Sequence, residues 1–239
     1  MHQNVILEPI SSQLRLSLNI ENVDSLFPGF MFGDFAVLNG SSTVQSLLSS
    51  LCVRAQLPYQ LGGLETNVLF VDGSNSFRLY DVSTIAQSCE LNPGEVLRRI
   101  FLSRAFTAYQ LTSLVFEQLQ STIEKYNSKL VILSNLARLY LDKDLPKKEA
   151  QEVFLQLTTY LANFAKKNSL ILIATQPPCF WSKRNKFFKE VLCERANVVA
   201  SIKRFRHRPY FVLEKHPDFK LGKAAFPSSD ITLADFMEA

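Results

Sequence analysis

The stretch "LNGSSTVQSLLSSLC", residues 38–52, has the order of elements that a phosphate-binding loop requires. The apolar run 35–38 predicts a strand and Gly40 predicts a turn. Apolar residues at Leu47, Leu48 and Leu51 predict a helix after the turn. Strand, glycine turn and helix frame the motif G-x-x-x-x-G-K-[ST], whose lysine reaches bound phosphates. This stretch has no lysine and no second glycine. The stretch therefore has the strand–turn–helix arrangement of the motif but lacks the residues that bind phosphate, so the motif does not explain the function of the turn.

The rest of the chain repeats the alternation of strand and helix. Apolar β-rich runs cover residues 67–72, 129–134, 169–175, 197–203 and 210–215, with the little alternation expected of strands covered on both faces. Helical spacing of apolar residues covers 103–126 and 146–167. This order predicts an α/β fold, with a mainly parallel sheet and helices on both faces. The short segment 204–209 predicts a β-hairpin at the sheet edge.

Composition favours a globular protein of one domain. The chain has 239 residues, 47% of them hydrophobic, which is enough for a sizeable core. Its start has no signal-peptide pattern, and no apolar run approaches the ~20 residues of a membrane helix, so we expect no membrane partner. The four cysteines are far apart and lack C-x-x-C spacing, which indicates reduced, mostly buried thiols in an intracellular protein and argues against a structural zinc site.

Four segments in a fixed order resemble a known family. They are residues 52–110, "KLVILSNLARLY" at 129–140, "LILIATQ" at 170–176 and "HPDFKLGKAAF" at 216–226. Together they resemble the RecA/RadA recombinases, closest to the archaeal and eukaryotic strand-exchange branch. The resemblance implies a RecA-like ATPase core as one domain over residues 1–239, with an N-terminal extension at 1–24 and a C-terminal tail at 227–239.

The chain also departs from that family at its catalytic positions. The family's phosphate-loop lysine is missing, its water-orienting glutamate falls on Ser74, and its Mg²⁺-supporting Walker B aspartate falls on Ser134. The degenerate phosphate loop consists of Gly40, Ser41, Ser42 and Thr43. A hydroxyl cannot act as a general base at neutral pH. We therefore expect a recombinase paralogue without ATPase activity, catalytic residues, metal or cofactor. Nucleotide binding without hydrolysis stays open, because hydroxyls at a helix N-terminus can hold an anion.

A basic block lies on a nearly neutral chain. Nine Lys or Arg and two acidic residues between Lys183 and Arg208 give a local charge of +7, against +4 for the whole chain. In the family a DNA-binding loop occupies the segment that corresponds to residues 177–197. Cations neutralise phosphates and aromatic rings stack on bases. The expected DNA-binding residues are Trp181, Lys183, Arg184, Lys186 and Lys189. The alternative is that Phe187 and Phe188 belong to the core and the cations only solvate the surface.

The last residues contain a second candidate contact. Recombinase protomers join through a phenylalanine and an alanine spaced F-x-x-A, and Phe236 and Ala239 have this spacing in "DFMEA". The resemblance implies that they dock on a recombinase. A packed terminal helix turn would explain the same residues.

The sequence therefore predicts a non-catalytic recombinase paralogue. We expect it to bind single-stranded DNA and a RadA-type recombinase or another paralogue, and to load or stabilise the filament in homologous recombination and DNA repair. Its compartment would be the cytoplasm in a prokaryote and the nucleus in a eukaryote. Two alternatives remain: a weak or trans-complemented DNA-dependent ATPase, and a protein-binding scaffold of the same fold without DNA contact.

Overall fold

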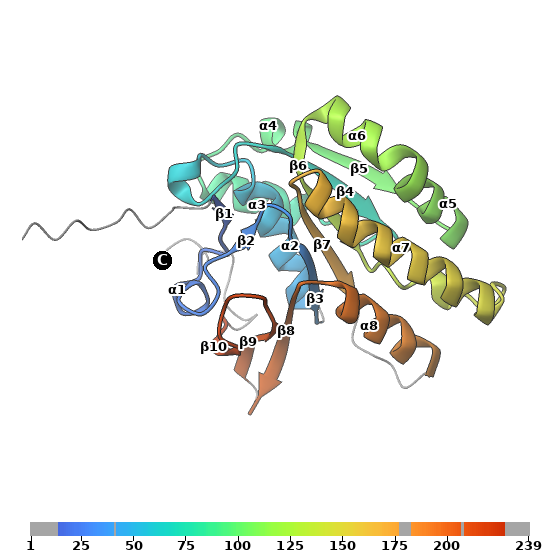
Figure 1. Cartoon of the computed structure of the whole chain (residues 1–239). Coiled ribbons are helices and arrows are strands. Elements are labelled where there is room, and N and C mark those ends of the chain that lie inside the picture. Colours follow the sequence, from blue (N-terminus) through green and yellow to red (C-terminus); the bar gives the residue numbers. More distant parts are fainter. Residues whose placement is uncertain (1–13, 41, 177–182, 207, 228–239) are drawn as a thin grey trace, which may run out of the picture.

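The computed structural model describes residues 14–40, 42–176, 183–206 and 208–227 (Figure 1). Within them an eight-stranded sheet has the order β10-β9-β8-β3-β7-β6-β4-β5, and a small sheet pairs β1 with β2. The strands are β1 (Arg15–Leu16), β2 (Phe30–Met31), β3 (Phe35–Asn39), β4 (Asn67–Asp72), β5 (Ile100–Arg104), β6 (Ser128–Ser134), β7 (Ile171–Gln176), β8 (Val198–Phe205), β9 (Arg208–Lys215) and β10 (Gly222–Ala225).

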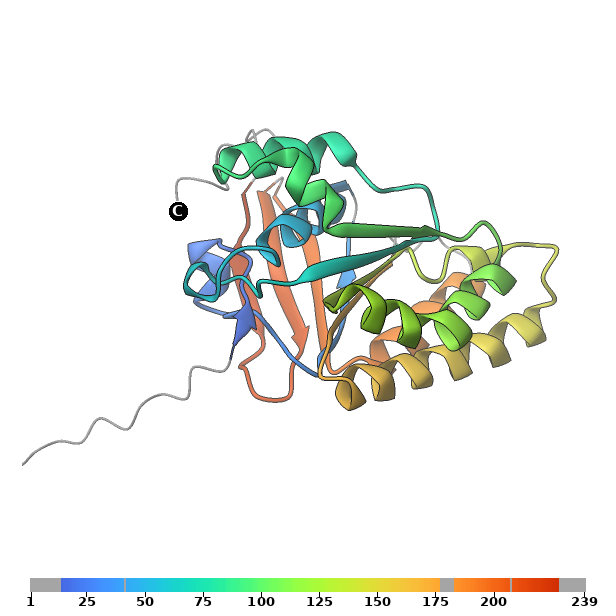
Figure 2. The ribbon, with the colours of Figure 1, turned by 90° about the horizontal axis from the view of Figure 1, so that it is seen from above.

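Helices cover both faces of the main sheet (Figure 2). The α-helices are α1 (Glu21–Asp24), α2 (Ser42–Arg54), α3 (Leu79–Ser88), α4 (Pro93–Arg98), α5 (Ala108–Ser113), α6 (Leu119–Tyr126), α7 (Lys147–Lys167) and α8 (Lys183–Arg195). A π-helical turn at Leu114–Gln118 joins α5 to α6, and two 3₁₀ turns lie at Tyr59–Leu61 and Leu139–Leu141. No helix in the described ranges is long and apolar enough to cross a membrane.

The central strands are apolar on both sides because each side meets a layer of helices. In β3, Ala36 and Leu38 join the core beneath α2, α3 and α4, whereas Phe35 and Val37 join the core beneath α5 to α8. Successive side chains of a strand point to opposite faces, so each strand contributes to both cores. This explains the continuous apolar runs, and the predicted α/β fold with a mainly parallel sheet is confirmed.

The two outermost strands were not predicted from the sequence. β5 lies at one edge of the sheet and alternates in burial, and Leu102 in its middle is 37% exposed. β10 lies at the other edge and pairs with β9, but its sequence "GKAA" has no β-branched residue. Residues 15–24, assigned above to an extension, form β1 and α1, and Leu16 and Val23 are fully buried.

The segment after β7 corrects one expectation. Residues from Lys183 onward were expected in a DNA-binding loop, but they form the helix α8. Asn185, Phe188 and Leu192 recur at helical spacing and are buried against the sheet and α7. The ring of Phe188 lies 4.8 Å from that of Phe154 in α7, and Phe187 packs on Phe188 at 5.6 Å. Phe188 therefore belongs to the core, and the half-buried Phe187 packs against it.

Arg184 fastens α8 to the segment that follows β6. Its guanidinium donates from Nε and Nη2 to the carbonyl oxygen of Tyr140 at 3.1 and 2.8 Å, and from Nη2 to that of Leu145 at 2.9 Å. The two carbonyl groups belong to the chain just before α7. A partly buried arginine thus joins two segments more than 35 residues apart in sequence.

We predict that Arg184→Ala lowers the stability of the fold. The change leaves two carbonyl oxygens without their charged donor, which should cost about 2–3 kcal/mol and lower Tm by roughly 4–12 °C in a thermal unfolding experiment. Lys186→Ala is the matched control, because Lys186 forms only an exposed ion pair with Glu190 at 3.6 Å. Equal melting temperatures for the two variants would contradict the anchoring role.

Candidate nucleic-acid interface

Strands β3 to β8 run parallel, so their carboxyl ends meet at one edge of the sheet, here called the carboxyl edge. Ligands of such sheets bind beyond this edge. The last residues of the four central strands are Asn39, Gln176, Ser134 and Asp72, in their order across the sheet. Each of them is at most 6% exposed.

The turn between β3 and α2 is too short to form the phosphate loop of the motif G-x-x-x-x-G-K-[ST]. The strand ends at Asn39 and the helix begins at Ser42, whereas the motif places four residues between its two glycines. A side chain at Gly40 would lie 2.5 Å from Cγ2 of Val44 and 3.5 Å from Cβ of Ile202, so α2 and β8 close around the turn. Thr43 is half-buried, while Ser41 and the side chain of Ser42 lie outside the described part of the chain.

The loop after β4 is organised around a buried carboxylate. Asp72 accepts hydrogen bonds from the backbone N–H groups of Ser74, Ser76 and Phe77 at 2.8–3.1 Å and from the hydroxyl of Ser76 at 3.1 Å. Asp72 is 1% exposed. These donors compensate the burial of the charge. The Asp72 carboxylate therefore stabilises the loop that follows β4.

The two serines at the catalytic positions belong to the same network. The hydroxyl oxygens of Ser76 and Ser134 are 2.6 Å apart. The side chain of Asn135 donates to the hydroxyl of Ser74 at 2.6 Å, and its backbone N–H donates to Thr175 at 2.8 Å. Neutral groups thus link the ends of β4, β6 and β7. In the described ranges no three His, Cys, Asp or Glu residues are grouped to hold a metal ion.

Gln176 ends the segment "LILIATQ" that resembles the family, and its side chain lies on the side of the sheet that α5 to α8 cover. Its side-chain amide donates to Asn185 of α8 at 3.0 Å, and Asn39 beside it donates to the sulfur of Cys193 at 3.8 Å. Burial raises the pKa of the Cys193 thiol, so the thiol stays neutral. These residues join α8 to the sheet.

The structure places only some of the predicted DNA-binding residues on an exposed surface. Trp181 lies outside the described residues, and Arg184 is bound to carbonyl groups. Lys183 and Lys186 are exposed on α8, and Lys189 is half-buried. Phe236 and Ala239 lie outside the described part of the chain.

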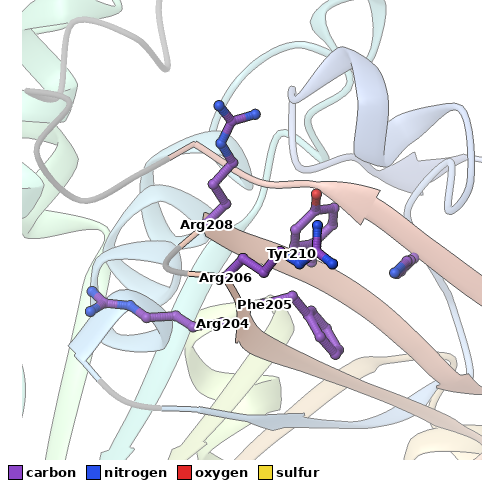
Figure 3. A pocket seen from close by; sticks show the side chains of 6 residues that line it. Arg204, Phe205, Arg206, Arg208 and Tyr210 are labelled. Atoms are coloured by element: carbon purple, nitrogen blue, oxygen red, sulfur yellow. The ribbon is translucent and has the colours of Figure 1, made fainter.

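A second basic and aromatic surface lies at the turn of the β8–β9 hairpin, where β8 ends at the carboxyl edge (Figure 3). Here a pocket of about 830 Å³ opens, which we call the hairpin pocket. Its lining residues are Arg204, Phe205, Arg206, Arg208, Tyr210 and Lys223. In Figure 3, Arg204 and Arg208 reach out from the hairpin in different directions.

The aromatic rings of this pocket are held in place by a cation. The ring centroids of Phe205 and Tyr210 lie 5.6 Å apart in an edge-to-face arrangement. The ammonium of Lys223 lies 4.9 Å from the Phe205 centroid and 5.3 Å from that of Tyr210. Phe205 nevertheless remains 42% exposed. An exposed ring among cations can stack on a base while its neighbours meet phosphates.

The carboxylate of Glu214 on β9 is paired with a lysine of β8. Glu214 accepts from Lys203 at 2.6 Å and from the hydroxyl of Ser201 at 2.8 Å. Burial alone would raise the pKa of Glu214, but these hydrogen bonds outweigh it and lower the pKa below its usual value. Glu214 is thus paired with Lys203, and neither residue lines the hairpin pocket.

Sequence reasoning counted the pocket's arginines in the basic block but did not select them. The signal was present, because Arg204, Arg206 and Arg208 alternate with Phe205 in a predicted hairpin. Lys223 could not be found, because it lies on β10, a strand that the sequence did not predict.

Comparison with known proteins agrees with this architecture. A family model described as Rad51 matches residues 15–176. The chain is 29% identical over 148 residues to a DNA repair and recombination protein RadA of Cenarchaeum symbiosum (strain A), an alignment that covers 61% of this chain and 36% of that protein. The chain thus spans about a third of the length of this relative. With most of its described sheet inside the matched residues, the chain belongs to the Rad51 family.

Proposed function

We propose that this chain is a non-catalytic member of its family that binds single-stranded DNA and a RadA-type recombinase, and so loads or stabilises a recombinase filament in homologous recombination and repair. The observation that carries the proposal is the hairpin pocket, which combines four cations with two aromatic rings at the carboxyl edge. Cations provide affinity for any phosphate backbone, and stacking on rings favours unpaired bases, which have open faces.

The proposed absence of catalysis is supported by the closed carboxyl edge. Hydrolysis of ATP needs an electrostatic clamp, an oriented water and a supported metal ion. Here the turn after β3 spans two residues, and the hydroxyl of Ser134 is turned to Ser76. The relative titled as a DNA repair and recombination protein supports work on DNA rather than another use of the fold.

The DNA-binding proposal predicts a specific loss. Arg206→Ala combined with Arg208→Ala should weaken binding of oligothymidine by roughly tenfold, about 1.4 kcal/mol, because two phosphate contacts are removed. The slope of log K against log salt should fall by roughly 0.7 for each contact. Fluorescence anisotropy across a salt series measures both.

Lys166→Ala with Lys167→Ala is the matched control for this loss. These lysines are equally charged and exposed, but they end α7 at the opposite edge of the sheet, before β7 begins. A control that loses as much affinity as the hairpin variant would sink the assignment of the pocket.

The proposal also predicts that the purified chain releases no phosphate from ATP above background, with or without DNA. Ser74→Glu with Ser134→Asp should not create turnover, because the loop that would clamp the phosphates is absent. A phosphate-release assay tests this. Turnover in the parent chain that disappears on changing Gly40 or Thr43 would contradict it.

Recombinase binding is proposed for Phe236 and Ala239. Phe236→Ala should lower affinity for a RadA-type recombinase by about tenfold or more, because a buried phenylalanine is a typical interface anchor. Tm should stay unchanged. A fall in Tm with unchanged affinity would instead make Phe236 a residue of the chain's own core.

A further inference from the structure

The antiparallel strands β8, β9 and β10 have an accessible side, called the open face, which bears Lys203, Phe205, Arg208, Tyr210 and Lys223. Lys203 pairs with Tyr210 and Phe205 pairs with Arg208 in the β8–β9 register. Paired residues of an antiparallel ladder point to the same face, so these four side chains share one side. Lys223 reaches the same two rings from β10. The open face therefore combines aromatic rings with cations from three strands.

The opposite side of these strands is covered by helices. Ala200, Phe211 and Leu213 point to that side and join the core beneath α2, α3 and α4. In the described part of the chain, no residue of β9 or β10 joins the other core, beneath α5 to α8. That core reaches β8 only near its start, at Val199. The open face thus lies beyond the helices of its own layer, as an antiparallel sheet allows.

The helix α8 places Lys189 at the margin of the open face. The sulfur of Cys193 accepts from the side chain of Asn39 at 3.8 Å, and Asn39 ends β3 as the register partner of Ser201 in β8. Because α8 joins β7 to the parallel strand β8, it runs back from the carboxyl edge. Lys189 lies one turn before Cys193 on the same side of the helix, about 6 Å nearer the carboxyl edge. It therefore lies beside the part of β8 that extends past β3.

The carboxylate of Glu214 links this lysine to the open face. Glu214 accepts from Lys203 at 2.6 Å and from Ser201 at 2.8 Å. Burial raises the pKa of Glu214, but these hydrogen bonds and the charges of Lys203 and Lys189 lower it below its usual value. Two lysines around one carboxylate leave a net positive charge between α8 and the rings of the hairpin pocket.

We propose that single-stranded DNA bound in the hairpin pocket continues across the open face to α8, where Lys189 contacts its phosphates. The inference rests on the proposed DNA binding of the pocket and extends that pocket into a track. In the strand order, the rings of Phe205 and Tyr210 lie between Lys223 on β10 and Lys189 on α8, which packs over β3. Cations that follow the backbone on both sides of stacking rings suit a single strand.

The first test measures binding of the full chain to an oligothymidine of about 12 nucleotides, within the site sizes of non-specific single-strand binders. Lys189→Ala should weaken binding roughly threefold and lower the slope of log K against log salt by roughly 0.7, because one phosphate contact is lost. Lys189→Arg keeps the charge and should bind like the parent. Tm should be the same for all three chains.

Lys167→Ala is the matched control for this test. Lys167 is an exposed lysine that ends α7 at the opposite edge of the sheet. Its loss changes the net charge equally but removes no contact of the track. A salt slope that stays at the parent value in Lys189→Ala, or that falls as much in Lys167→Ala, would overturn the proposal.

The second test maps the path of the DNA directly. An oligothymidine with a photoreactive thymine analogue at each end should form cross-links to two peptides of one chain, 203–211 and 183–195. Cross-links to 203–211 alone would overturn the track while the proposed DNA binding of the pocket stands. Cross-links to neither peptide, or no binding of DNA by the parent chain, would remove the proposed function and this inference together.

Discussion

Burial of the central strands between two helix layers constrains everything else in this protein. Because β3, β6 and β7 are apolar on both faces, a ligand can meet their residues only where the strands end. In this chain those ends are themselves buried, with Asp72 holding its own loop and Ser134 bonded to Ser76. The exposed basic and aromatic side chains of the same edge lie on the hairpin that extends from β8 and on the neighbouring β10.

The same constraint relates the closed edge to the hairpin pocket. A site for a nucleotide needs charged groups that are pre-organised but unoccupied. Here the short turn at Gly40 lets Val44 and Ile202 pack against it, and Ile202 belongs to the strand that carries the pocket. Ile202, which packs against the turn, therefore also belongs to the hairpin. Under the proposed function, the same packing closes the phosphate turn and supports the strand that carries the hairpin pocket.

Much of the fold was predictable from the sequence, and the failures have identifiable causes. The central strands were found because double-sided burial leaves an unbroken apolar run, as in "LVIL" of β6. β5 and β10 were missed because edge strands are half-exposed, and "GKAA" has no preference for a strand. In α8, the cations around Phe187 and Phe188 resembled a DNA-binding loop, although Asn185, Phe188 and Leu192 carry the helical period. The role of Arg184 could not be predicted, because its acceptors are backbone carbonyls of a distant segment.

Amide hydrogen exchange, followed by mass spectrometry on the full chain, tests the central claim most directly, because one experiment compares both surfaces. The account predicts that single-stranded DNA slows exchange in the peptide 203–211, and that Mg·ATP leaves exchange in the peptide 38–48 unchanged. Protection of residues 38–48 by Mg·ATP, together with an unchanged hairpin in the presence of DNA, would contradict it.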